Sequence, residues 1–126
     1  MSANILPGSR ILVVEDEALV CMLIEDMLGE LGCAVAATAA SLDEAVALAR
    51  TGDFDAAILD VNLGNERSYP VADVLKERGT PFVFSTGYDN LQQGYSCYPR
   101  IQKPYRQSEL AKILNAVLTR HEDDSR

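Results

Sequence analysis

The sequence predicts an α/β fold, in which a doubly wound, five-stranded parallel sheet carries helices on both faces. The first observation is that short, uninterrupted apolar runs recur along the chain, as expected for strands that are buried on both sides. The second is that apolar residues between these runs recur at helical spacing. The third is that this alternation of strand and helix repeats five times. Right-handed crossovers would then make all strands parallel.

The predicted strands are brief and end in polar residues or turns. The second is rich in small side chains, which is typical of an edge strand, and Pro81 is tolerable only at the beginning of the fourth. In chain order, the five predicted strands cover residues 10–14, 33–37, 55–60, 80–85 and 100–102.

Four helices follow from apolar spacing and from start and stop residues. Ser41 and Glu44 have capping-box spacing. Ser68 and Pro70 indicate another helix start. The predicted helices cover residues 19–31, 41–51, 68–78 and 108–120. Residues 89–99 show little periodicity, so we expect any helix there to be short or poorly ordered, in the least stable region of the domain.

Length and charge restrict the function. The chain has 126 residues, which suits a single domain with a core at about 9–120 and a solvated tail at 121–126. Its formal net charge of -8 argues against nucleic acid as a direct ligand. Three cysteines without metal-ligand spacing indicate neither a disulfide framework nor a zinc site. With no signal peptide or membrane span in the sequence, we expect a cytoplasmic protein that does not associate with membranes.

Polar residues follow four of the predicted strands. The C-terminal ends of parallel strands meet at one edge of the sheet. The first strand is followed by Glu15 and Asp16, the third ends in Asp60, the fourth leads into Thr86, and the fifth into Lys103. Each residue alone has an ordinary explanation, such as a helix dipole, a turn or a solvated lysine. Convergence of all five at one edge favours a functional site.

The predicted site suits phosphoryl chemistry. Two carboxylates about 4 Å apart repel by roughly 4 kcal/mol at an effective dielectric constant near 20, so a cation is needed among Glu15, Asp16 and Asp60. Mg²⁺ accepts such ligands, and Lys103 is a second counter-charge. With Thr86 as a hydroxyl donor, these groups could surround a phosphoryl group that is attached to Asp60 as the nucleophile. The residues therefore predict an aspartyl phosphate.

This ordered set of residues resembles, over nearly the whole chain, the receiver domain of bacterial two-component response regulators. The resemblance implies a flavodoxin-like sheet of order 2-1-3-4-5. It also implies self-catalysed phosphotransfer and autodephosphorylation in a signalling domain that is not otherwise an enzyme. The implied roles are metal binding for Glu15, Asp16, Asp60 and the backbone carbonyl of Asn62, phosphoacceptor for Asp60, switch hydroxyl for Thr86, and invariant lysine for Lys103, whose bond to Pro104 is usually cis in the family.

Two positions depart from the usual receiver pattern. Receivers commonly have Tyr or Phe three residues before the lysine, where this chain has Arg100. Residues 82–88 are similar to a subgroup with a Phe-Ala-Thr-Gly-Tyr-like motif, with Ser85 at the Ala position. Signalling could then depend on a reordering of residues 88–99 instead of an aromatic switch.

Other functions fit less well. A haloacid-dehalogenase-like phosphatase also forms an aspartyl phosphate, but it needs an acid at the position of Asn62 and a nucleophile on the first strand. A flavodoxin-like electron carrier must bind a phosphate where Glu15 and Asp16 would repel it. The single histidine, His121, lies beside the tail, and there is no Walker loop or GxGxxG motif. A binding-only domain that has lost phosphate turnover remains the main alternative.

The resemblance implies a sensor histidine kinase or a histidine phosphotransfer protein as the phosphodonor. In this family the first helix usually docks the kinase, here with Ala18, Cys21 or Met22 exposed. The sequence has no room for a DNA-binding domain, so we expect output through a downstream protein target or through phosphate flow, from a monomer or weak homodimer. A stand-alone regulator, a phosphorelay intermediate and a fragment of a longer regulator all fit. Asn62 and Tyr88 lie where receivers control water access to the acyl phosphate.

Overall fold

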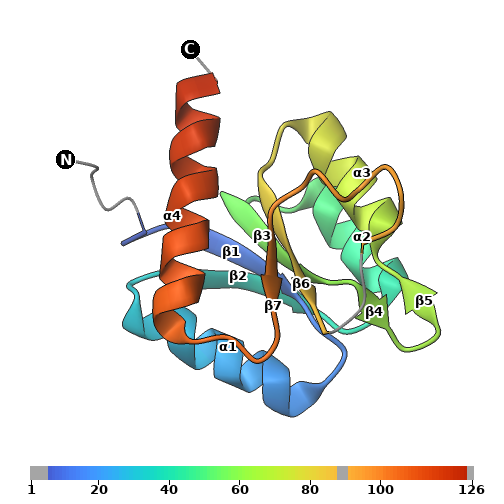
Figure 1. Cartoon of the computed structure of the whole chain (residues 1–126), viewed down its shortest axis with the longest axis horizontal. Coiled ribbons are helices and arrows are strands. Elements are labelled where there is room, and N and C mark those ends of the chain that lie inside the picture. The colour runs from blue at the N-terminus through green and yellow to red at the C-terminus, as the bar shows by residue number, and fades with distance from the viewer. Residues whose placement is uncertain (1–5, 88–90, 125–126) are drawn as a thin grey trace.

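A five-stranded parallel sheet forms the centre of the computed structural model, which describes residues 6–87 and 91–124, with side chains as far as residue 119 (Figure 1). The strand order β2-β1-β3-β6-β7 confirms the predicted order 2-1-3-4-5, because β6 and β7 are the fourth and fifth strands of this sheet. The strands are β1 (Arg10–Val14), β2 (Ala34–Ala39), β3 (Ala56–Asp60), β6 (Phe82–Thr86) and β7 (Arg100–Gln102).

Helices cover both faces of the sheet, as predicted: α1 and α4 lie on one face and α2 and α3 on the other (Figure 1). The Ser41 hydroxyl accepts a hydrogen bond from the Glu44 amide, which confirms the predicted cap of α2. Gly79, with a φ of 75°, ends α3 in the left-handed region that favours glycine. The helices are α1 (Ala18–Glu30), α2 (Leu42–Thr51), α3 (Tyr69–Arg78) and α4 (Gln107–Asp124).

Successive strand residues alternate between two apolar layers. On β3, Leu59 belongs to the layer beneath α2 and α3, whereas Ile58 belongs to the layer beneath α1 and α4. On β6, Phe84 and Val83 divide in the same way. Burial on both faces explains why these strands are apolar runs without polar alternation. Asp60 follows Leu59, and the same alternation directs its carboxylate toward the α1 side.

One of two weakly patterned regions differs from what the sequence indicates. The segment after Asp60 contains a short antiparallel hairpin, β4 (Asn62–Leu63) and β5 (Glu66–Arg67), where a loop was predicted. Residues 91–99 form turns, so this described part of the weakly periodic segment contains no helix.

The last helix is longer than the sequence indicates. The predicted helix end at residue 120 was wrong, because α4 continues to Asp124, whereas the solvation of the tail at 121–126 stays a prediction. The sequence has no Gly or Pro stop signal after Thr119. Among the described helices, none combines the length and the apolar character that crossing a bilayer requires.

Candidate functional site

Three carboxylates meet at the C-terminal edge of the sheet. Glu15 follows β1 directly, Asp16 comes next, and Asp60 is the last residue of β3. One carboxylate oxygen from each lies within 4.8 Å of the others. Glu15 is 2% exposed and Asp60 is 5% exposed, whereas Asp16 is open to solvent. The structure therefore brings together the three acidic side chains that the sequence predicted to bind a metal.

Lys103 supplies a positive charge to this cluster. Its Nζ donates a hydrogen bond of 2.9 Å to Glu15 Oε1 and lies 3.4 Å from Asp60 Oδ2. Pairing between β6 and β7 positions the lysine, because the Lys103 amide donates to the Thr86 carbonyl at 2.7 Å. The Lys103–Pro104 peptide bond is cis, as the family resemblance implied. Burial opposes the lysine's charge, but the hydrogen bond to Glu15 and the charges of Asp60 and Glu15 outweigh it and raise the pKa of Lys103.

Backbone amides hold each carboxylate in place. The Glu17 amide donates to Glu15 Oε2 at 3.2 Å, and the Asn62 amide donates to Asp60 Oδ1 at 3.3 Å. The Gly64 amide, at the tip of the β4–β5 hairpin, donates to Asp16 Oδ2 at 3.0 Å. Sequence reasoning missed this last contact because the hairpin had no apolar pattern to reveal it. The hairpin thus connects the segment after Asp60 to the acidic pair after β1.

The environment of Asp60 disfavours its charge. Burial, followed by the hydrogen bond and the negative charge of Glu15, raises the pKa of Asp60 from 3.8 to about 7. Lys103 and the Asn62 amide act in the opposite direction but do not balance these effects. A single ammonium group therefore leaves an excess of negative charge among the three carboxylates.

This donor set fits Mg²⁺. Each of the three acidic residues offers a carboxylate oxygen, which a hard divalent cation prefers, and the exposed Asp16 leaves the site open to water ligands. A divalent cation would also offset the repulsion that raises the pKa of Asp60. The Asn62 backbone amide donates a hydrogen bond to Asp60. Metal binding by the Asn62 carbonyl oxygen stays a prediction.

Thr86 lies at the same edge as Asp60. It is the last residue of β6, is 5% exposed, and follows Ser85, which pairs with Asp60 across the two parallel strands. The structure therefore places all five predicted side chains at this edge, while the switch role of the Thr86 hydroxyl stays a prediction. Tyr88, predicted to limit water access, lies outside the described residues.

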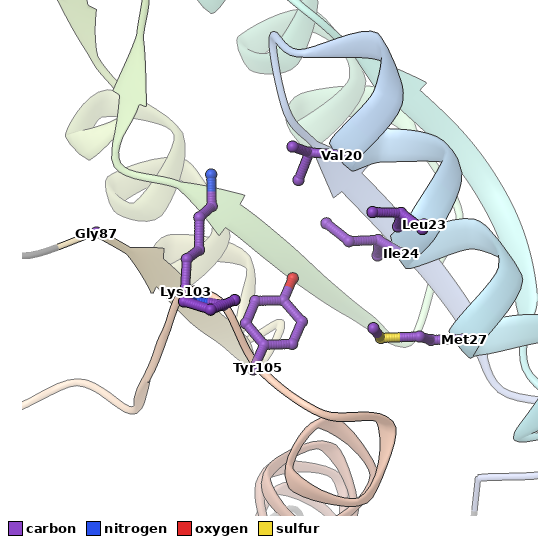
Figure 2. A pocket seen from close by; sticks show the side chains of 8 residues that line it. Val20, Leu23, Ile24, Met27, Gly87, Lys103 and Tyr105 are labelled. Atoms are coloured by element: carbon purple, nitrogen blue, oxygen red, sulfur yellow. The ribbon is translucent and has the colours of Figure 1, made fainter.

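An apolar cavity of about 380 Å³ lies beside the acidic cluster (Figure 2). Figure 2 shows Val20, Leu23, Ile24 and Met27 of α1 on one side, and Lys103 and Tyr105 on the other. The hydroxyl of Tyr105 is buried without a hydrogen-bond partner in the described structure, and burial raises the pKa of Tyr105. The sequence did not single out Tyr105, because only the fold brings it opposite α1.

The sheet order and the acidic cluster with its lysine are those of a receiver-type signalling domain. The chain belongs to the response regulator receiver domain family, because the family profile described as "Response regulator receiver domain" matches residues 11–115. Receiver domains are signalling domains and are generally not classed as enzymes.

Solved structures agree with this family assignment. The chain is 43% identical to SdrG from Sphingomonas melonis Fr1, with a TM-score of 0.79 over 89% of this chain and 97% of that one. The receiver domain of PhyR from Erythrobacter litoralis is 26% identical, with a TM-score of 0.78 over 90% of this chain and 92% of that one.

The anti-anti-sigma factor PhyR from Bartonella quintana is 25% identical, with a TM-score of 0.80 over 92% of this chain and 50% of that chain. A comparison with curated protein sequences returned no match.

Proposed function

We propose that this receiver domain accepts a phosphoryl group on Asp60, with Mg²⁺, from a sensor histidine kinase or a histidine phosphotransfer protein. The observation that carries the proposal is the arrangement around Asp60: two further carboxylates within 4.8 Å and the Lys103 ammonium 3.4 Å from its Oδ2. The reaction takes place in the cytoplasm, where the free thiols of Cys21, Cys33 and Cys97 stay reduced. The signal leaves through protein contacts, since the acidic surface disfavours nucleic acid.

The transfer begins with Asp60 ionised. One of its carboxylate oxygens attacks the phosphorus of a phosphohistidine, the P–N bond breaks, and its electron pair returns to the imidazole, which takes a proton from solvent. The product is an acyl phosphate on Asp60. Lys103, 3.4 Å from Asp60 Oδ2, would contact a phosphoryl oxygen while it remains bound to Glu15, and Thr86 is the candidate hydroxyl donor to another.

Glu15, Asp16 and Asp60, with the Asn62 carbonyl, would hold Mg²⁺. When bound, the ion supplies positive charge that favours ionised Asp60 and stabilises the charge on the transferring group. The Asn62 and Gly64 amides fix two of these carboxylates before the donor arrives, which limits the reorganisation needed for transfer.

Helix α1 is the proposed docking surface for the donor. Leu19 is 76% exposed and Met22 and Leu23 are each 58% exposed, and this grouping of exposed large apolar side chains supports the proposed docking surface. Ala18 is exposed as well, whereas Cys21 is only partly exposed and its thiol contacts Glu25. The cavity beside Tyr105 lies next to this surface and could receive an apolar side chain of the donor.

The direct test is phosphorylation by a small phosphodonor. We expect wild type incubated with acetyl phosphate and Mg²⁺ to gain the mass of one phosphoryl group, which hydroxylamine removes because it cleaves acyl phosphates. Asp60→Asn should gain none, and Asp26→Asn, which changes an exposed carboxylate on α1, should react as wild type does. Absence of an adduct on the wild type would favour a binding-only domain.

A haloacid-dehalogenase-like phosphatase is less well supported. Asp60 ends the third strand of the chain, and Asn62 cannot transfer a proton as the acid of such an enzyme does. The same experiment separates the two functions, because a phosphatase would release phosphate from many phosphoesters, whereas a receiver would consume only activated donors.

A further inference from the structure

Residues 91–98 follow the fourth strand of the sheet and lie against α3, where the orange chain passes beside that helix in Figure 1. Tyr69, the first residue of α3, provides two of the contacts. Its hydroxyl accepts a hydrogen bond of 2.8 Å from the Gln92 amide, and its ring lies 4.3 Å from the Tyr95 ring, measured between centroids. The Tyr69 ring also meets Phe84 of β6 edge-on, at 5.7 Å.

A second set of contacts holds the same segment further along α3. The Tyr95 hydroxyl donates a hydrogen bond of 2.9 Å to Asp73 Oδ1, and Lys76 Nζ lies 5.9 Å from the centre of the Tyr98 ring. The helix side of these contacts consists of exposed groups, although the Tyr95 and Tyr98 rings also lie 6.3 Å from the Phe84 ring. Tyr69 differs, because it is 8% exposed and stands where the segment after Asp60 joins α3.

Backbone hydrogen bonds join the two ends of the segment between Val61 and Ser68 and connect it to β6. The Ser68 amide donates to the Val61 carbonyl at 3.0 Å, and the Val61 amide donates to the Ser85 carbonyl at 3.1 Å. The β4–β5 hairpin lies between Val61 and Ser68 in the chain. A direct hydrogen bond therefore links Val61, the neighbour of Asp60, to Ser68, and Tyr69 is the next residue.

The usual aromatic on the last strand is missing in this chain. Arg100 occupies that position and is exposed, so it cannot pack an aromatic ring against the end of β6. Tyr69 is buried against Phe84, two residues before Thr86, and contacts the 91–98 segment directly.

We infer that Tyr69 is a positioning residue that couples the occupancy of the Asp60 site to the conformation of residues 91–98. This inference rests on the proposed function. A phosphoryl group on Asp60 adds charge and volume at the beginning of the closed 61–68 segment. The resulting shift moves the beginning of α3, and with it the hydroxyl that binds Gln92 and the ring that packs on Tyr95.

The test measures amide hydrogen exchange of a peptide within residues 91–98, with Mg²⁺ and with or without beryllofluoride as the phosphoryl mimic. In wild type we expect beryllofluoride to change the exchange rate at least about threefold, a change of the size that a modest shift in local opening produces. Tyr69→Phe keeps the ring and removes the hydrogen bond to Gln92. We expect this variant to lose at least about half of the beryllofluoride-dependent change.

Tyr95→Phe is the matched control. It removes a hydrogen bond of similar length from the same segment, at Asp73, so it should speed exchange of residues 91–98 in a similar way. It should nevertheless keep the response to beryllofluoride. If the Tyr69 hydrogen bond only stabilised residues 91–98, Tyr69→Phe and Tyr95→Phe would affect that response to the same extent.

Thermal shift measures beryllofluoride binding separately, and Asp60→Asn should show none. If wild type and Tyr69→Phe both bind the mimic and residues 91–98 respond equally, the role of Tyr69 is refuted while the phosphoacceptor function stands. The role of Tyr69 is refuted in the same way if the mimic binds wild type and residues 91–98 do not respond. If wild type neither binds the mimic nor forms the acetyl phosphate adduct, the proposed function fails, and the coupling fails with it.

Discussion

Asp60→Asn should stabilise the folded protein when no divalent cation is present. The folded site raises the pKa of Asp60 from 3.8 to about 7, first through burial and then through Glu15. Folding therefore disfavours the ionised carboxylate at neutral pH, and an amide of the same shape removes that cost.

The size of the effect follows from the pKa. A pKa difference of one corresponds to about 1.4 kcal/mol, so the rise of Asp60 to about 7 sets an upper limit of ~4 kcal/mol at high pH. Water reaches the site beside the exposed Asp16 and screens these charges, so we expect a gain of roughly 1–2 kcal/mol in the free energy of unfolding.

The pH dependence of the free energy of unfolding shows the direction of the Asp60 effect. Between about pH 4 and about pH 7 the unfolded chain has released the Asp60 proton while the folded protein keeps it. Because the folded state then binds more protons, this group lowers wild-type stability as the pH rises through that window. Asparagine does not titrate, so the advantage of Asp60→Asn should widen up to about pH 7 and stay constant above it.

Urea denaturation in the presence of a chelator, at several pH values, measures this difference. Asp26→Asn serves as the control, because that carboxylate is exposed on α1 and its replacement should change the free energy of unfolding only slightly. Adding Mg²⁺ should stabilise wild type and reduce the difference in the free energy of unfolding between wild type and Asp60→Asn. A variant less stable than wild type at about pH 8, or a gap that does not grow with pH, would refute the electrostatic account.

Three further outcomes are expected. Met22→Glu, on the exposed face of α1, should slow transfer from a cognate kinase at least about tenfold while leaving urea stability within about 0.5 kcal/mol of wild type; unchanged transfer would exclude this docking surface. Ser41→Ala removes the cap of α2 and should lower the free energy of unfolding by about 1 kcal/mol in the same denaturation assay, with Ser41→Asp close to wild type. Tyr88→Ala should shorten the lifetime of the acyl phosphate, followed by loss of the phosphorylated mass, and a longer lifetime would count against the proposed shielding.

The site could be predicted from the sequence because its residues directly follow apolar runs. Glu15 and Asp60 stand at strand ends, and parallel strands bring their C-terminal ends to one edge whatever the details of the loops. Lys103 belongs to this group because the short β7 still has a buried centre, Ile101.

Features that depend on tertiary contacts could not be predicted. The β4–β5 hairpin has no periodic pattern, and its Gly64 amide is fixed by Asp16, which lies far away in the sequence. Likewise, the path of residues 91–98 depends on contacts with the Tyr69 ring and hydroxyl and with the Asp73 carboxylate of α3, not on local propensity. The end of α4 was placed too early because polarity was taken as a stop, although charged residues extend a helix readily when no Gly or Pro intervenes.

The position of Arg100 has a consequence for how this protein meets its own copies. β7 is an outer strand of the sheet, only three residues long, and its unpaired side could accept a strand from another molecule. Pro99 and Pro104 flank the strand and have no amide proton to donate, and Arg100 adds an exposed charge to it. The β7 edge of the sheet therefore resists extension by a strand from a second copy of the protein.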